Sequence, residues 1–222
     1  LCGGHQCVCA NAARMAHGGA PRQPRHAARN AGPHRIIALG FALTTMDDLV
    51  QQAMRKWPNV PACFGWLGLD DRGDWYMRDD AVQAQGSFAQ AKGSKLAHIK
   101  LIEFIQRNYT ADEHGQWYFQ NGPQRVFVEL LSAPFVWRIQ ADLSVTDGAG
   151  VVQHVQHCVM DDAGRVYLAT NQGFGLVHSQ DVWLAAQALE EKRWAEKKMP
   201  ASELASMYGF VKSPQQRAAS IT

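Results

Sequence analysis

Long apolar runs are missing from this sequence of 222 residues, and none approaches the ~18 consecutive apolar residues that a membrane-spanning helix needs. The motifs G-x-S-x-G, H-E-x-x-H and GxGxxG are also absent, as is a phosphate-binding P-loop. These absences argue against membrane insertion and against several classes of hydrolase, metalloprotease and nucleotide-dependent enzyme. The 46% hydrophobic content and the seven tryptophans nevertheless predict a globular protein with a substantial core.

Acidic residues are missing from the first 45 positions, which hold five arginines and therefore carry a charge of +5. Residues 46–222 hold 17 basic and 20 acidic side chains, a net charge of −3. A mildly acidic body without a basic stripe is not expected to bind nucleic acid, because neutralising phosphates requires clustered Lys and Arg. Only Cys63 and Cys158 lie in this body, and two cysteines give no disulfide framework, so we expect a cytoplasmic protein.

The composition changes abruptly at Met46. Ala, Gly, Arg, His, Pro and Cys dominate residues 1–45, whereas TTMDDLVQQAMRKW predicts a helix capped by Thr45 or Asp47. We interpret Met46 as the natural start and residues 1–45 as a translated leader or a disordered extension.

Two other interpretations of residues 1–45 remain open. IIALGFAL could belong to a signal peptide, although it is short and no A-x-A cleavage pattern follows closely. A knot of cysteines and a histidine could bind a metal, although zinc sites usually pair two such elements across ~12 or more residues. The members of this knot are Cys2, His5, Cys7 and Cys9.

Three similar octapeptides punctuate the body: DDRGDWYM at 70–77, DEHGQWYF at 112–119 and DDAGRVYL at 161–168. Asp accepts hydrogen bonds from the backbone ahead of it, and Gly supplies the positive φ that closes a hairpin. The alternating aromatic and β-branched residues that follow are typical of a strand. We therefore predict three β-hairpins, and their spacing also raises the alternative of a β-propeller. A propeller needs at least ~4 blades, and a helix separates only one pair of these units, so we do not favour it.

Helical spacing of apolar residues predicts a central helix from Ser94 to Tyr109, a long helix from Ser179 into the lysines at 197–198, and a short one within 200–210. The expected fold class is α+β, with two small lobes of antiparallel β-hairpins, a central helix and C-terminal helices. The predicted division is an extension at 1–45, a first lobe at 46–140, a second lobe at 141–211 and a tail at 212–222.

GDWYM, KLAHIKLIEFIQRNY and DEHGQWYFQNGPQRVFVELLSAPFVWRI together resemble the bacterial family called domain of unknown function 1285. VYLATNQGFGLVHSQDVWL is similar to a later segment of that family, so the resemblance covers roughly residues 65–184. It implies a two-lobed α+β fold and a role in ligand sensing or signalling, with no established chemistry. This chain departs from the family at Asn121–Arg125, where Arg125 replaces a lysine.

Candidate catalytic residues are few. In HVQHC, strand alternation directs His154 and Cys158 to one face and His157 to the other, so the three are not expected to converge on a metal. Cys63 could form a nucleophilic pair with a histidine, although a free cysteine is commonly a small buried hydrophobe. His98 is interpreted as a partly exposed helix residue. We expect no metal and no cofactor.

A polar turn flanked by tryptophans is the best candidate for a ligand site, because such sites combine apolar walls with a few polar groups. Arg125 offers a planar fork suited to a carboxylate or phosphate. In the alternative, Asn121–Gly122 only turns the chain and Arg125 pairs with Glu129. The candidate ligand-binding residues are Trp117, Asn121, Gln124, Arg125, Glu129, Trp137 and Asn171, with Gln172 beside the last.

Three functions are compatible with these patterns. The preferred one is a non-catalytic protein that binds a small anionic ligand or a protein partner between its lobes. The second is an enzyme of unrecognised type that uses Cys63 or the strand from His154 to Cys158. The third is an interaction module that docks a partner through Trp183 and Trp194, although Trp183 is expected to pack on the sheet. The oligomeric state is not predicted.

Overall fold

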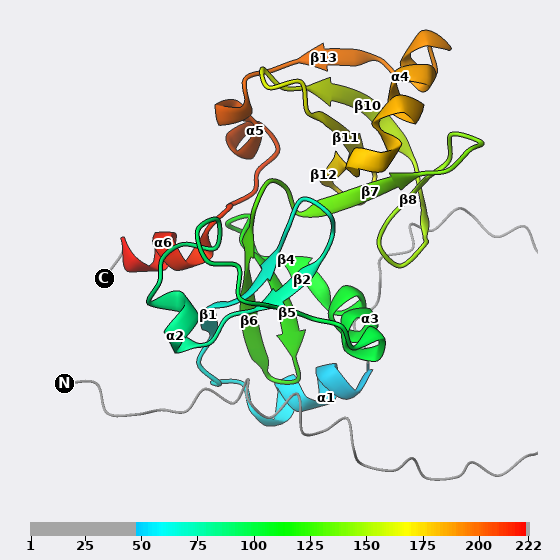
Figure 1. The fold of residues 1–222 in the computed structure, drawn as a ribbon. Coiled ribbons are helices and arrows are strands. Elements are labelled where there is room, and N and C mark those ends of the chain that lie inside the picture. Colours follow the sequence, from blue (N-terminus) through cyan, green and yellow to red (C-terminus); the bar gives the residue numbers. More distant parts are fainter. Residues whose placement is uncertain (1–47, 221–222) are drawn as a thin grey trace, which may run out of the picture. The chain divides into compact units, whose positions relative to one another are not determined.

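The computed structural model describes residues 48–220, which belong to one compact unit spanning 46–222. The predictions for residues 1–45, and the caps predicted at Thr45 or Asp47, fall outside the described residues. Helices combine with two mixed β-sheets, as Figure 1 shows, so the predicted α+β class is confirmed. None of the helices between residues 48 and 220 has the length and apolar character that crossing a bilayer requires.

The first sheet has six strands in the order β3-β2-β1-β6-β5-β4. Its neighbours are antiparallel except β1 and β6, which run parallel where the unit β1–β3 meets the unit β4–β6. The strands are β1 (Cys63–Leu69), β2 (Trp75–Met77), β3 (Ser94–Lys95), β4 (Tyr109–Ala111), β5 (Trp117–Asn121) and β6 (Gln124–Leu130).

The second sheet has seven strands in the order β13-β10-β11-β12-β7-β8-β9. Only His154 separates β9 from β10 in sequence, yet the two lie far apart in this order, so the sheet curves into a half-barrel. The predicted lobe division after residue 140 falls just behind β7, which belongs to this sheet. The strands are β7 (Phe135–Ile139), β8 (Val145–Thr146), β9 (Val152–Gln153), β10 (Val155–Met160), β11 (Val166–Thr170), β12 (Phe174–Val177) and β13 (Glu196–Lys198).

The helices confirm some predicted elements and correct others. They are α1 (Asp48–Lys56), α2 (Asp80–Gln83), α3 (Ile99–Arg107), the 3₁₀ helix η3 (Ser179–Asp181), α4 (Val182–Glu190), α5 (Ala201–Met207) and α6 (Pro214–Ala219). The predicted start of the central helix at Ser94 is wrong, because Ser94 and Lys95 pair with β2 instead. Helix α3 begins behind His98, whose Nδ1 accepts the backbone N–H of Leu101 as an N-cap.

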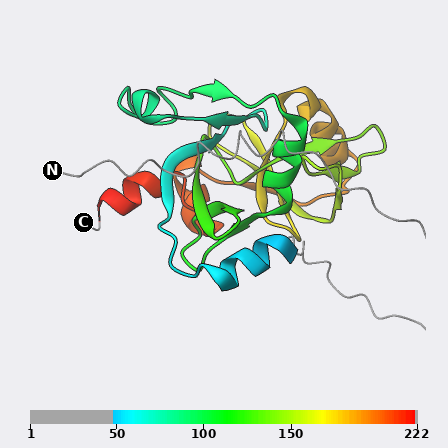
Figure 2. The same cartoon turned by 90° about the horizontal axis from the view of Figure 1, so that it is seen from below.

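Two predictions for the C-terminal part are wrong. The long helix ends at Glu190, because residues 190–193 are all charged and offer no apolar side chain to bury, and the following backbone pairs with β10 as β13. The expected tail contains α6, which is capped by Ser213 and begins with the buried Pro214. Figures 1 and 2 show α6 beside β1 and β6 of the first sheet.

The predicted hairpins are confirmed, and their turns share one hydrogen-bond pattern. In each turn, the Asp Oδ1 accepts the backbone N–H groups two and four residues ahead, and the Asp carbonyl accepts the N–H of the Gly three residues ahead. The turn that begins at Asp147 has the same pattern, although its sequence suggested only a polar break. The four glycines adopt φ between +74° and +80°, which favours glycine strongly: they are Gly73, Gly115, Gly150 and Gly164.

Helix α4 covers the core of the second sheet with Leu184, Ala185 and Ala188. The predicted packing of Trp183 on the sheet is wrong, since its side chain is 64% exposed, whereas Trp194 does pack against this core. The difference arises because a helix buries the residues that meet the sheet, and the sequence did not show which side of α4 would do so.

Candidate functional site

The predicted ligand residues are divided between two faces of the first sheet. Cross-strand pairing joins Gln120 to Arg125 and Asn121 to Gln124, so alternation directs Arg125 and Glu129 to one face and Trp117, Asn121 and Gln124 to the other. Gln124 is buried and donates from Nε2 to the carbonyl of Pro61 at 3.0 Å. The predicted residues therefore do not converge on one groove.

Trp117 and Trp137 belong to aromatic packing between the sheets. The ring centroid of Trp117 lies 4.8 Å from that of Tyr109 and 4.9 Å from that of Phe135, which stacks on Trp137 at 4.8 Å. Trp137 is fully buried and donates from Nε1 to the carbonyl of Leu168 at 3.0 Å. Rings at these distances fill the space between them, so this cluster holds the sheets together.

Glu129 is a structural carboxylate, and it does not pair with Arg125. It is 3% exposed, and its oxygens accept from the Ser213 hydroxyl at 2.5 Å and from the backbone N–H of Gln215 at 3.0 Å. Burial raises its pKa, although these hydrogen bonds and the nearby charge of Arg78 act in the opposite direction. The carboxylate thus anchors the start of α6 to β6.

Arg78 supplies the positive charge on this side of the sheet. Its guanidinium is fully buried and donates to the carbonyls of Gly65, Gly86 and Ala91. Burial lowers its pKa, while the charge of Glu129 raises it in part. Arg78 ties the segment between β2 and β3 to β1, a role that no sequence pattern indicated.

Asn171 stabilises the bend between β9 and β10. Its side-chain Oδ1 accepts the backbone N–H of His154 at 2.8 Å, and its own N–H donates to the carbonyl of His154 at 3.1 Å. The side-chain oxygen and the backbone N–H of Asn171 are thus both bonded to the backbone of His154. These two hydrogen bonds fix the point where the half-barrel turns. The predicted position of Asn171 in a ligand groove is therefore replaced by a backbone contact, and Gln172 lies half-buried beside it.

The catalytic candidates do not form a common centre. His157 contacts the hydroxyl of Tyr208 through Nε2 at 2.9 Å, while Cys158 is fully buried in the core on the side of α4. Burial raises the pKa of the Cys158 thiol to about 11, and Cys63 is 4% exposed at the start of β1. Among residues 48–220, no three His, Cys, Asp or Glu side chains gather in a way that could hold a metal ion.

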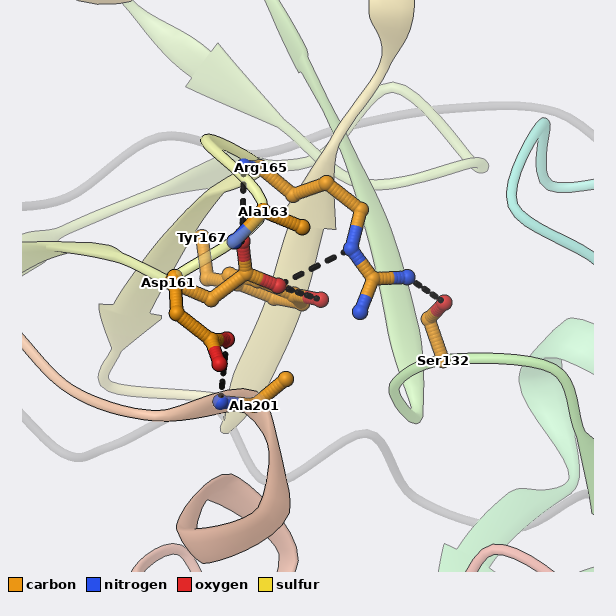
Figure 3. Close-up of polar contacts among 7 residues, drawn as sticks. Ser132, Asp161, Ala163, Arg165, Tyr167 and Ala201 are labelled. Carbon is orange, nitrogen blue, oxygen red and sulfur yellow. Dashed lines mark hydrogen bonds and ion pairs between the residues drawn. The ribbon is translucent and has the colours of Figure 1, made fainter.

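A polar cluster lies between the two sheets, and Figure 3 shows its contacts. Arg165 donates from Nε to Asp161 at 2.9 Å and from one terminal nitrogen to the hydroxyl of Ser132 at 3.1 Å. The buried Tyr167 donates to the same Asp161 carboxylate at 3.2 Å. Ser132 follows β6 of the first sheet and Arg165 precedes β11 of the second, so Arg165 links the sheets while its charge is neutralised by Asp161.

An exposed arginine lies at the start of β6, just after the β5–β6 turn. The Arg125 guanidinium is exposed and lies 5.0 Å from the centroid of the Tyr118 ring, and no carboxylate among residues 48–220 pairs with it. We define the basic turn patch as Arg125 together with the Tyr118 ring beneath it.

Helix α1 and the loop that follows it lie beside the β5–β6 turn. A Cβ atom placed on Gly122 would lie 3.9 Å from the Cβ of Ala53, so α1 meets the turn there. Lys56 and Trp57 follow Ala53 by three and four residues, and they share its side of the helix. The loop after Trp57 is held beside β6 by the Gln124–Pro61 hydrogen bond.

A comparison with known protein families matches most of this chain to one family model. The family model DUF2944, described as "Protein of unknown function (DUF2946)", matches residues 46–215. The chain belongs to this family. Among solved structures, this DUF2944 member is similar to a crystal structure of a DUF1285 family protein from Silicibacter pomeroyi DSS-3, with a TM-score of 0.40 and 14% identity over 64% of this chain and 85% of the other. No curated protein matches the chain.

The matched residues of this DUF2944 member include the basic turn patch, the aromatic packing between the sheets and the Arg165 cluster. Of the residues predicted for a ligand site, Arg125 and Asn171 are exposed, and Asn121 is half-buried on the face of the sheet opposite Arg125.

Acid is expected to destabilise this DUF2944 member partly through Asp161. Burial acts to raise the pKa of this carboxyl, but hydrogen bonds from Arg165 outweigh burial and hold the pKa below its ordinary value of 3.8. A carboxyl with a lowered folded-state pKa contributes stability that is complete above its unfolded-state pKa and is lost as the pH falls through the folded value. Urea unfolding at several pH values should show a smaller loss below pH 3.8 for Asp161→Asn than for the wild type. Equal losses in both proteins would contradict this assignment.

Proposed function

We propose that this DUF2944 member is a non-catalytic, cytoplasmic binding protein that recognises a carboxylate or phosphate group of its ligand or partner at the basic turn patch. The observation that supports this most is Arg125, an exposed guanidinium held over the Tyr118 ring without a carboxylate partner among residues 48–220. Stacking on an aromatic ring leaves the planar edge of the guanidinium, with its N–H donors, available for an anion.

Three other arginines among residues 48–220 are already engaged, and Arg125 differs from the exposed Arg72 in being held over an aromatic ring. Arg165 and Arg138 each pair with a buried aspartate, and Arg78 donates to three backbone carbonyls inside the protein. Their charges are already neutralised or their donors already used, so an incoming anion would have to displace existing contacts. Arg125 requires no such exchange, because its ring contact is compatible with an anion at its edge.

Support for a non-catalytic role comes from the placement of the nucleophile candidates. Cys63 is buried and disulfide-bonded, so it offers no thiolate, and the raised pKa of the buried Cys158 keeps it as a thiol at neutral pH. His154 engages Asn171 through its backbone, and the Nε2 of His157 contacts the Tyr208 hydroxyl. The enzyme hypothesis would therefore need groups that the sequence did not single out.

Arg125→Ala is expected to abolish the stabilisation of the protein by anions. Pyrophosphate and citrate, used as probes with the full chain, should raise the melting temperature of the wild type, since a ligand at 100 times its Kd stabilises by about 2.7 kcal/mol. Differential scanning fluorimetry measures the change in melting temperature, and isothermal titration calorimetry measures the binding of each anion.

Arg72→Ala provides the matched control, because Arg72 is an exposed arginine in the β1–β2 turn. It should leave the response to both anions unchanged. The proposal fails if neither anion stabilises the wild type, or if the Arg125→Ala protein responds as strongly as the wild type does.

A further inference from the structure

Gln120 carries a buried acceptor that receives no hydrogen bond. Its side chain is fully buried, and its Nε2 donates to the carbonyl of Gly122 at 2.8 Å. Among the described residues 48–220, no donor reaches its Oε1. The Gly122 contact fixes which end of the amide is which, because a reversed amide would set two oxygens against each other. A buried acceptor without a donor is costly and rare in native proteins, so this oxygen requires an explanation.

The register of the β5–β6 hairpin places this acceptor beside the basic turn patch. Gln120 on β5 is directly opposite Arg125 on β6. Directly opposed residues of an antiparallel pair project from one face of the sheet, with Cβ atoms about 4.5–5.5 Å apart. Tyr118 precedes Gln120 by two residues and shares this face, and its ring holds the guanidinium of Arg125 at 5.0 Å from the centroid. A cation without a carboxylate partner and an acceptor without a donor therefore lie side by side among residues 48–220.

The hairpin itself offers no carboxylate that would compete for Arg125. Residues 114–128 contain no Asp or Glu. Glu129 shares the face of Arg125 but lies four residues farther along β6, about 13 Å along the strand. The oxygens of Glu129 are also bonded to Ser213 and Gln215. A carboxylate that approached Arg125 would therefore meet little repulsion from this strand.

We infer that the ligand recognised at the basic turn patch is a small carboxylate that carries a hydroxyl or an amine next to its charge, and this inference rests on the proposed function. Its carboxylate accepts from the guanidinium of Arg125, and its O–H or N–H donates to Oε1 of Gln120. A plain carboxylate offers acceptors only, so it would satisfy the arginine and leave the buried oxygen without a donor. Because Gln120 is shielded from solvent, the group that reaches it must be a single small one.

Two matched pairs of probes test the inference with the full chain at about pH 8, where carboxyl groups are ionised. Citrate and tricarballylate carry the same carboxylates, and only citrate has a hydroxyl. Glutamate and glutarate also carry the same carboxylates, and only glutamate has an amine. Isothermal titration calorimetry should show about tenfold tighter binding of the donor-bearing member in at least one pair, because a buried acceptor gains its missing hydrogen bond. The pair that shows the preference identifies the donor.

Variants assign the preference to its residues. Gln120→Met removes the acceptor and keeps an unbranched side chain, so the two members of each pair should bind it equally well. Gln153→Met is the matched control, because Gln153 is a buried glutamine of the second sheet, and it should keep the preference of the wild type. Arg125→Ala should weaken binding of every probe that binds the wild type by about tenfold or more.

The outcomes distinguish this inference from the function on which it rests. If both members of each pair bind the wild type equally well and respond to Arg125→Ala, the assignment of a donor is wrong and the proposed function stands. If no probe responds to Arg125→Ala, both fall. A preference that persists in folded Gln120→Met would show that Gln120 is not the acceptor. The comparison on the wild type needs no variant, so it decides the matter even if Gln120→Met does not fold.

Discussion

Glu129→Leu is expected to lower the free energy of unfolding by about 2–6 kcal/mol, which is about 1–3 kcal/mol for each of the two donors that would lose their acceptor. Arg78 would remain inside the protein with its guanidinium fully buried and no carboxylate nearby to balance it. The Ser213 hydroxyl and the Gln215 N–H would also lose their acceptor, so α6 should detach from β6 more easily. Urea unfolding followed by tryptophan fluorescence measures the loss.

Two further variants identify the cause of this loss. Glu129→Gln also removes the charge but keeps an acceptor for Gln215 and a partner for Ser213, so it should cost less than Glu129→Leu by the part that belongs to the hydrogen bonds. Combining Glu129→Leu with Arg78→Met should cost less than the sum of the two single changes, because the double variant leaves no unbalanced buried charge. An additive double variant would show that the two groups do not interact.

Gly115→Ala is expected to destabilise the protein by about 2–5 kcal/mol, which combines positive φ for alanine, about 1–2, with overpacking, about 1–3. Gly115 has φ of +74°, and a Cβ atom there would overlap the carbonyl oxygen of Gly209. The chain between α5 and α6 lies against this turn and donates the Val211 N–H to the Gly115 carbonyl. Backbone cannot rotate away as a side chain can, so the β4–β5 turn and the chain between α5 and α6 must separate.

Gly164→Ala is the matched control for the steric part. Gly164 has the same φ of +74° in the same type of turn, but a Cβ atom there would meet no atom within 4 Å. Its substitution should therefore cost only the backbone part, about 1–2 kcal/mol. The two variants are compared by urea unfolding under the same conditions. If they were equally destabilised, contact with Gly209 and Phe210 would contribute nothing.

The hairpins could be predicted because their information is local. An Asp oxygen binds N–H groups within four residues, and a Gly three residues on closes the turn, so a short sequence holds all the groups that the turn needs. The turn at Asp147 was missed because the short residues around it, Thr-Asp-Gly-Ala-Gly, lack the aromatic residues that marked the other three. Its hydrogen bonds are nevertheless the same.

Helix ends were less predictable where distant strands compete for the same backbone. Ser94 has the side chain of a helix cap, yet it pairs with β2, which lies more than fifteen residues earlier. Residues 196–198 have good helix formers, yet they complete the edge of the second sheet beside β10. Tertiary pairing overrides a modest helical preference, because each residue's propensity differs by less than about 1 kcal/mol.

The candidate site shows the same difference between local information and long-range contacts. That Arg125 carries a planar charge in a polar turn follows from its identity and its neighbours, and the exposed turn agrees with it. That Glu129 serves α6 and Trp137 serves the core could not be known, because each depends on a partner more than thirty residues away.

The α+β class, the positions of the first, second and third Asp-Gly turns, and the sign of the charge near residues 49–69 follow from the order of the amino acids. These properties depend on residue identity and on contacts between near neighbours. Long-range packing brings α1 to the β5–β6 turn, lets Arg165 join the two sheets, and places the buried charges of Arg78 and Glu129 on one face. Those contacts bring together residues far apart in the chain, where solvent exclusion and the geometry of the sheets select the partners.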